Sequence, residues 1–415
     1  MLQLTIPTNS EIKAYFPHIR ICLVKVFYVL VYCVLKRNTV NLNICKKYMG
    51  EALGQKGINT DSAYRRLTRF FTMRTPRMFC IGISYLIINI LCNSGQSGFY
   101  WAIDRTNWQI GKKNKVNCNV LALGLVLNNG CFIPIIGLLL NKKGNSNERE
   151  RINLINDFCK FFFSCLPEKL RAEQHIFLGD REFIGEKWFE HLVAKGFSLV
   201  MRLRKDDYLH QLAIAQNTTV YKIKRKIKHR VKRDGFFYSP ICINNIDLVY
   251  VVLPNSNPKA EKKDHLVRFI SDLTNLKQIS DAYCQRWQIE VYFKHCKTNG
   301  FNLEDLNLKK DDKMLLMTAI VGFAYVLAIV QGLLRMQQKP VKKQYFANQD
   351  KYYLRKSIFK QGMDQITINV FNLFDLLELI KAHIPDKPLF NKQAWVHGLI
   401  NEYTNNNKQL SKSVQ

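Results

Sequence analysis

Apolar residues repeat along this chain with two different periods, which divide it into helical and strand-rich parts. Up to about residue 98, long apolar runs such as IRICLVKVFYVLVYCVLK and GISYLIINILC predict buried helices. From residue 99 the runs shorten to strand length. FYWAIDRTNW predicts a strand that ends at Asp104, and NVLALGLVLNNG and CFIPIIGLLLN predict two more strands joined by a turn at NNG.

Helices and strands then alternate. ERERINLINDFCKFFFSCL predicts a helix, HIFLGDREF a strand with Asp180 at its end, GEKWFEHLVAKG a helix closed by Gly196, and FSLVMRLR a strand. This order predicts an α/β layer fold whose first three strands are antiparallel. Open α/β sheets place their chemistry at strand ends, although an aspartate there is also common as a turn or helix-cap residue.

The stretch after this layer is strongly basic. Residues 205–263 alternate basic with apolar or polar residues and contain several turn signals, which predicts a small β-rich insertion. Its most basic run, KIKRKIKHRVKR, is either a solvated loop or a contact for phosphate backbone. HLVRFISDL then predicts a return to a strand, and the uncharged run 314–330 predicts a buried helix in preference to a membrane span.

Between these last two segments lies a helix with an unusual polar face. In YCQRWQIEVYFKHCK (283–297), a turn of 100° per residue places Tyr283, Arg286, Glu290 and Lys297 on one narrow face. The simpler interpretation is a solvated helix with ion pairs between residues four apart. A lone carboxylate among cations also suits a place where metal ions and phosphate are both held.

Composition narrows the class of partner. The chain has 62 Lys and Arg against 32 Asp and Glu, a formal charge of +30, and 47% hydrophobic residues, so it is not a disordered protein. Such an excess of positive charge favours nucleic acid as the partner, with an anionic membrane second. Twelve cysteines without a CxxC or zinc-finger spacing indicate free thiols in a reducing cytoplasm.

Three carboxylates are the candidate catalytic and metal-binding residues. Asp104, Asp180 and Glu290 would jointly hold two divalent cations, which activate an attacking oxygen and stabilise a leaving oxygen in phosphoryl transfer. Magnesium suits such a site because it takes carboxylate oxygens and keeps positions for water and phosphate.

The residues around that glutamate are the candidate phosphate-binding groups. Arg286 would bind phosphate through its planar fork, and Lys297 as a point charge. Tyr283 would hydrogen-bond a phosphate oxygen, and Trp287 would stack on a base or sugar unless it packs in the core. Lys294 lies on the same helix face and completes the set.

The spacing Y-x2-R-x3-E-x6-K of Tyr283, Arg286, Glu290 and Lys297 resembles the Y-R-E-K signature of bacterial insertion-sequence transposases of the "insertion sequence 4" type. DRTNW, which starts at Asp104, and GDREF resemble the surroundings of that family's two catalytic aspartates. The resemblance covers roughly residues 60–335, and it is specific because three separate motifs occur in the right order.

The resemblance implies an RNase H-like catalytic core, with Asp104, Asp180 and Glu290 as the metal-binding triad for two Mg²⁺ ions that Mn²⁺ can replace. It implies cut-and-paste transposition, in which the enzyme binds the terminal inverted repeats, cleaves the DNA and joins the freed 3′ hydroxyl to target DNA. It also implies a homodimer on double-stranded DNA, located in the bacterial cytoplasm with the nucleoid and not in a membrane.

These expectations give a domain organisation and two alternatives. The expected parts are a helical, DNA-binding region at 1–75, a first core part at 76–204, the β-rich basic insertion at 205–263, a second core part at 264–340, and a C-terminal helical region at 341–415 that is a candidate for dimerisation. The alternatives are a catalytically inactive or domesticated DNA-binding remnant of a mobile element, and a membrane protein built around 314–330.

Overall fold

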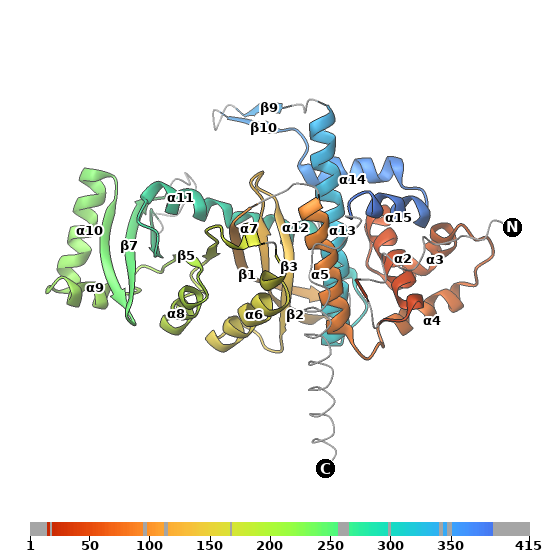
Figure 1. Ribbon diagram of the computed structural model, residues 1–415, viewed down its shortest axis with the longest axis horizontal. Coiled ribbons are helices and arrows are strands. Elements are labelled where there is room, and N and C mark those ends of the chain that lie inside the picture. The colour runs from red at the N-terminus through yellow and green to blue at the C-terminus, as the bar shows by residue number, and fades with distance from the viewer. Residues whose placement is uncertain are drawn as a thin grey trace, which may run out of the picture.

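The structure, a computed structural model, describes residues 15–384 with short gaps. The residues left out within that span are 17–18, 94–97, 112–114, 167, 256–264, 298–299, 340–342 and 347–350. In Figure 1 a helical part occupies one end of an elongated molecule and a sheet extends away from it, with the long helix α13 between them. Residues 385–415 lie outside the described residues.

One eight-stranded mixed sheet forms the centre of the molecule, in the order β3-β2-β1-β4-β5-β8-β7-β6. β1, β2 and β3 are antiparallel as predicted, whereas β4 runs parallel to β1 and β5 parallel to β4. The strands are β1 (Tyr100–Ile110), β2 (Val116–Val126), β3 (Phe132–Leu140), β4 (Ile176–Gly179), β5 (Ser198–Arg202), β6 (Phe237–Ile243), β7 (Ile246–Pro254) and β8 (Leu266–Ser271).

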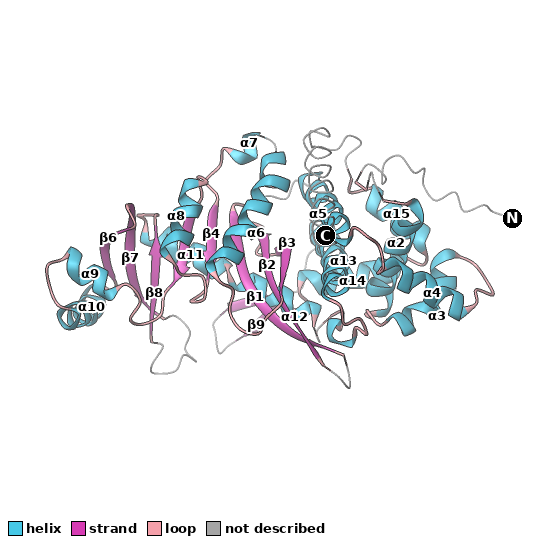
Figure 2. Cartoon of the chain, turned by 90° about the horizontal axis from the view of Figure 1, so that it is seen from below, coloured by secondary structure: helices cyan, strands magenta, loops and turns pink. Residues whose placement is uncertain are grey.

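Helices cover both faces of this sheet (Figure 2). On one face α6 (Glu148–Phe161) and α8 (Glu186–Ala194) pack through residues such as Phe158 and Trp188. On the other face α11 (Leu276–Gln285) packs Ile279 and Ala282 against β4, β5, β7 and β8. The predicted α/β layer fold is therefore confirmed, and the strand, helix and turn order from residue 99 to 202 is as expected.

The helical part is built around α13 (Asp311–Gln338), which packs against α5, α2 and α14. Its apolar run was predicted to be a buried core helix, and 83% of that run is buried inside the protein. A second helix, α5, contains the run GISYLIINILC that was also predicted to be a buried helix; it is long and apolar enough to cross a membrane, and 67% of its run is buried. The other helices of this part are α2 (Ile21–Arg37), α3 (Leu42–Leu53), α4 (Thr60–Phe70), α5 (Pro76–Asn93), α14 (Ile358–Asn369) and α15 (Leu373–Lys381).

The insertion at 205–263 corrects one expectation, because it is only half β-structure. Two helices, α9 (Leu209–Ala215) and α10 (Val220–Asp234), precede the hairpin β6–β7. The basic run KIKRKIKHRVKR is most of α10 and not a loop. Its apolar residues Ile223, Ile227 and Val231 recur every four positions, which is the helical period and outweighs the apparent alternation.

The remaining elements are short. They are η1 (Phe163–Cys165), α7 (Glu168–Arg171), η3 (Leu303–Asp305) and the hairpin β9 (Lys343–Phe346) with β10 (Lys351–Leu354).

The cysteines of the described residues are free, as the absence of a pairing pattern predicted. The helix α4 begins after Asn59, whose side chain caps it by accepting hydrogen bonds from the backbone N–H groups of Asp61 and Ser62.

Candidate functional site

The register of the central sheet brings Asp104 and Asp180 to the same place. β1 and β4 pair in parallel up to Ala102 and Leu178, so two residues further along each strand the register aligns Asp104 with Asp180. Asp180 follows the last residue of β4, as predicted. Asp104 does not end its strand, because β1 continues to Ile110 while paired with β2. It marks instead the point where the β1–β4 pairing ends.

A tight turn after β4 positions Asp180, and Gly179 makes this turn possible. A Cβ atom on Gly179 would lie 2.6 Å from Sδ of Met201 and 2.7 Å from Cβ of Phe183, closer than real Cβ contacts. The turn closes with a hydrogen bond of 2.8 Å that the backbone N–H of Phe183 donates to the carbonyl of Asp180. The glycine of the GDREF motif is therefore required by packing.

The helix predicted over 283–297 is divided at Arg286. α11 ends at Gln285 and α12 (Trp287–Cys296) begins directly afterwards, with Arg286 in helical conformation between them. α12 packs on the same sheet face as Asp104, where the ring of Phe293 meets Trp108 of β1 at 5.8 Å. This places Glu290, in the first turn of α12, opposite the strand that carries Asp104.

Arg286 joins two of the three predicted carboxylates. Its Nη1 donates a hydrogen bond of 3.0 Å to Oδ2 of Asp104, and its Nη2 donates to Oε1 of Glu290. The arginine is 6% exposed, and its Nε is buried with no hydrogen-bond partner among the described residues. A buried guanidinium with one unsatisfied donor is suited to accept a further anionic ligand.

Burial controls the charge of this cluster. It raises the pKa of Asp104 to about 6, against the opposing effect of Arg286, while Asp180 and Glu290 raise it further by repulsion. Burial alone would lower the pKa of Arg286, but Tyr283 and the three carboxylates together raise it above its ordinary value. Arg286 therefore stays charged, and burial favours the protonated form of Asp104 in spite of its pair with Arg286.

Tyr283 completes the cluster from α11. Its hydroxyl donates a hydrogen bond of 3.3 Å to Oδ1 of Asp180, and burial raises its pKa to about 12. The Tyr283 ring packs against Phe269 of β8, with ring centroids 4.8 Å apart. The structure thus brings together Asp104, Asp180, Tyr283 and Arg286 with Glu290 of α12.

An open groove of about 830 Å³ leads to this cluster. Trp287 is 50% exposed on its wall, and Nζ of Lys294 lies 4.7 Å from the centre of the Trp287 ring. The groove is also lined by Arg181 and Arg202, which were not among the residues predicted from sequence. Arg181 lies inside the GDREF motif, so it had a signal, whereas only the tertiary structure shows that Arg202, at the end of β5, faces this groove.

Lys297 is not among the residues that line the groove, although the spacing predicted it on the helix face that carries Glu290. It caps the end of α12, and its Nζ forms an ion pair of 3.2 Å with Oε1 of Glu304. The same carboxylate oxygen accepts a hydrogen bond of 3.2 Å from the backbone N–H of Gln109 in β1. In this structure Lys297 therefore connects α12 to the far end of β1.

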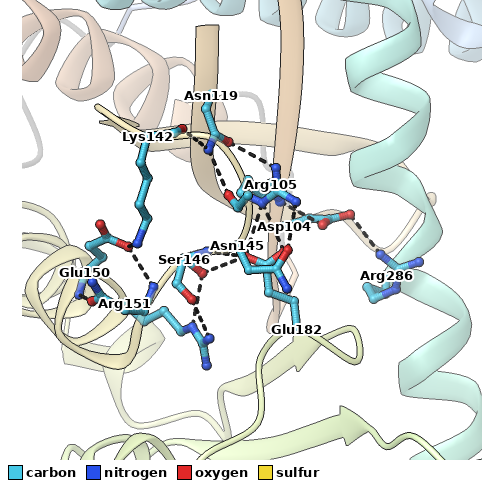
Figure 3. A network of polar contacts seen from close by, with 12 residues as sticks. Asp104, Arg105, Asn119, Lys142, Asn145, Ser146, Glu150, Arg151, Glu182 and Arg286 are labelled. Carbon is cyan, nitrogen blue, oxygen red and sulfur yellow. Dashed lines mark hydrogen bonds and ion pairs between the residues drawn. The ribbon is translucent and has the colours of Figure 1, made fainter. Parts of the chain in front are cut away.

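A second ion pair ties the two aspartate motifs together (Figure 3). Arg105, next to Asp104, donates from Nε to Oε2 of Glu182 at 3.0 Å, and both side chains are largely buried. Arg105 also donates to Oδ1 of Asn119 at 3.2 Å. Because Glu182 follows Asp180 by two residues, this pair holds the turn after β4 against β1.

The same glutamate anchors the start of α6. Oε1 of Glu182 accepts two hydrogen bonds of 2.7 Å, from the backbone N–H and the hydroxyl of Ser146. Arg151 of α6 donates to the Ser146 hydroxyl at 3.1 Å and to the carbonyl of Ile184 at 3.0 Å. Figure 3 shows this chain of contacts running from Asp104 to α6. The network suggests that Arg105 and Glu182 are positioning residues.

The carboxylate oxygens of the cluster suit a hard divalent cation, but in this structure two of the carboxylates are bound to Arg286. Within the described residues, no three His, Cys, Asp or Glu side chains lie close enough together to hold one metal ion. Asp104 and Glu290 are joined through Arg286 instead. Carboxylate oxygens are the ligands that Mg²⁺ prefers, so the residues fit this ion in kind once the guanidinium moves aside.

Comparison with known proteins gives one finding. A protein-family model described as "Transposase DDE domain" matches residues 101–327, which is more than half of the chain. The matched region begins in β1 and ends within α13, so it contains all three carboxylates, the groove and the insertion. No curated protein matches the chain.

Proposed function

The chain belongs to the transposase DDE domain family, which implies an RNase H-like core and a DNA-processing enzyme. From this premise we propose that the protein is the transposase of an insertion sequence of the "insertion sequence 4" type. It binds the terminal inverted repeats as a homodimer, cleaves the DNA there and transfers the 3′ hydroxyl ends into target DNA. It acts on nucleoid DNA in the bacterial cytoplasm.

The observation that carries this proposal is the meeting of three distant motifs around one arginine. Asp104 and Asp180 are aligned by the β1–β4 register, and Glu290 reaches the same point from α12 through Arg286. Carboxylates crowded at the end of an open groove repel one another, and such repulsion favours a divalent cation.

In this proposal Asp104, Asp180 and Glu290 hold two Mg²⁺ ions, or Mn²⁺ in their place. When bound, the ions activate the attacking oxygen and stabilise the leaving oxygen in phosphoryl transfer. The protein's own groups then position the DNA. Tyr283 and Arg286 exchange their carboxylate contacts for phosphate oxygens, and the buried Nε of Arg286 supplies an additional donor.

The exposed residues of the groove wall have a different task. Trp287, half-exposed, offers an aromatic face on which a base or sugar stacks, and Lys294 adds positive charge beside it. Lys297 reaches DNA only if its ion pair with Glu304 opens, because that pair now holds its side chain.

The test is cleavage of a labelled duplex that carries the terminal repeat flanking the gene, with Mg²⁺ or EDTA, by the wild-type protein and by Glu290→Ala. The expected result is nicking at the repeat boundary that requires Mg²⁺ and is lost in the variant. Lys313→Ala is the matched control, a charged residue at the start of α13 outside the groove lining, and it should cleave like the wild type.

Two other outcomes refute parts of the proposal. Binding of the repeat without cleavage by the wild-type protein would make the chain an inactive or domesticated DNA-binding remnant. Cleavage that survives Glu290→Ala would remove the glutamate from the catalytic set while leaving the family assignment intact.

A further inference from the structure

The insertion carries a strongly basic surface that the catalytic groove does not include. α10 contains eight lysines and arginines, and Asp234 is its only acidic residue. A single stripe, with Ile223 and Ile227 buried, fixes the helix to α9, β6 and β7. The basic side chains of α10 are exposed, so the helix is held rigidly and presents its charge to solvent.

A groove of about 470 Å³ runs beside this helix. It is lined by cations from three separate parts of the chain: Arg225 and Lys228 from α10, Lys205 after β5, and Arg268 from β8. Lys224 also lines it and is paired with Asp206 at 2.7 Å. Cations gathered from three distant segments indicate a built surface and not only a charged run of sequence.

These cations are poorly compensated within the protein. Among the described residues, Lys205, Arg225 and Lys228 form no ion pair. The Nε of Arg268 is buried without a hydrogen-bond partner in that same part of the chain. A buried donor without a partner is costly, so an anion that enters the groove would relieve this cost and the mutual repulsion of the cations together.

The groove lies on the other face of the sheet from the carboxylates but reaches the same end of β8. Side chains alternate along a strand, and Val267 lines the catalytic groove whereas Leu266 and Arg268 line this one. Near the end of β5, Arg202 lines the catalytic groove, and Lys205, three residues after the strand, lines this one. Positive charge therefore continues around the ends of β5 and β8, from the catalytic groove to the groove beside α10.

We propose that the α10 groove, defined by Lys205, Arg225, Lys228 and Arg268, is a second binding site for the phosphate backbone of double-stranded DNA, separate from the catalytic groove. The proposal rests on the proposed function for the identity of the polyanion. The 15 residues of α10 extend about 22 Å, which matches about six base pairs of duplex. The contacts are to phosphate, so this site binds DNA without regard to sequence.

The experiment measures how the affinity of the full-length protein for a 30-base-pair duplex of random sequence depends on salt, in EDTA so that no cleavage occurs. Fluorescence polarisation is recorded between 50 and 300 mM NaCl. The groove variant is Arg225→Gln with Lys228→Gln. The control variant is Lys222→Gln with Lys226→Gln, which removes the same charge from the same helix about 110° around its axis.

The groove variant is expected to lower the slope of log affinity against log salt by about 2, since each lost phosphate contact lowers it by about 0.9. Between 50 and 200 mM salt the wild-type protein then loses about 12-fold more affinity than the groove variant. Lys205→Gln, outside the helix, should lower the slope by about 1. The control variant should keep the wild-type slope, because Lys222 and Lys226 do not line the groove and so make none of its phosphate contacts.

Each other result overturns the proposal. Equal slopes for the wild type and the groove variant would leave α10 a solvated helix face, and equal losses in the groove and control variants would reduce it to diffuse charge. If the groove variant keeps the DNA slope but loses binding to vesicles with 30% phosphatidylserine, the surface serves a membrane. Circular dichroism melting checks that the variants fold. Because no cleavage is scored, failure of the catalytic proposal is seen separately, in the Glu290→Ala experiment.

Discussion

Removal of the positive charge at Arg286 should make the fold of this protein depend on magnesium. The guanidinium is 6% exposed and lies 3.0 Å from Asp104 while also contacting Glu290. The substitution Arg286→Gln leaves two carboxylates without their shared cation. Breaking a buried ion pair costs about 3–5 kcal/mol. We expect about 3 kcal/mol, the lower end of this range, because the Glu290 side chain is 29% exposed to solvent.

Magnesium should restore much of this loss. In Arg286→Gln the ion takes over the charge that the arginine supplied, whereas in the wild-type protein it must first displace the guanidinium. A ligand that binds only the folded state stabilises it by about 2.7 kcal/mol at 100 times its dissociation constant. For a chain of this length about 1 kcal/mol corresponds to about 2 °C in melting temperature. The variant should therefore melt about 6 °C below the wild type in EDTA and recover about 5 °C at saturating Mg²⁺.

The assay is thermal unfolding of the full chain without DNA, over 0–10 mM MgCl₂ at constant ionic strength. Lys294→Gln is the control. It removes an exposed cation of α12 that contacts the Trp287 ring and, within the described part of the chain, pairs with no carboxylate. It should follow the wild-type protein, which we expect to gain less than 2 °C. Equal gains for the wild type and Arg286→Gln, or no loss in EDTA, would show that Arg286 does not hold the place of a cation.

Three further outcomes are expected. Folding raises the pKa of Asp104 to about 6 through burial, so the folded state binds the carboxyl proton more tightly than the unfolded state. The stability that comes from this proton is fully present below about pH 4, and it is lost as the pH rises through 6. Asp104→Asn should therefore be more stable than the wild type at pH 7.5 by up to roughly 3 kcal/mol, and not at pH 4, in urea titrations; a constant difference would contradict this. Glu182→Gln weakens the 3.0 Å pair with Arg105 and should lower the cleavage rate at saturating DNA at least tenfold with little change in KM, while Glu182→Asp restores part of it; a change in KM alone would argue against positioning. Gly179→Ala forces a Cβ into Met201 and should cost about 1–3 kcal/mol in the same titrations. Gly137→Ala is the control, because Gly137 lies in β3 without a positive φ and an added Cβ would come no closer than 3.4 Å to its neighbours.

The sequence alone determined most of the local elements and indicated the candidate site residues. The strands from FYWAIDRTNW to FSLVMRLR and the long apolar helices were predictable because their periods are properties of consecutive residues. The candidate triad was found because three motifs stood in the right order, and the family match spans all three of them. The excess of lysine and arginine by itself likewise indicated a polyanionic partner, because net charge does not depend on how the chain folds.

Tertiary structure alone decided how these residues meet. Asp104 lies within β1, and only the parallel register with β4 aligns it with Asp180. The Arg286 bridge and the Arg105–Glu182 pair join residues up to 182 positions apart, and no local period carries information about such contacts. The second groove beside α10 depends on the packing of that helix against β6 and β7. Local sequence therefore sets which chemistry the chain contains, and long-range packing sets where that chemistry is assembled.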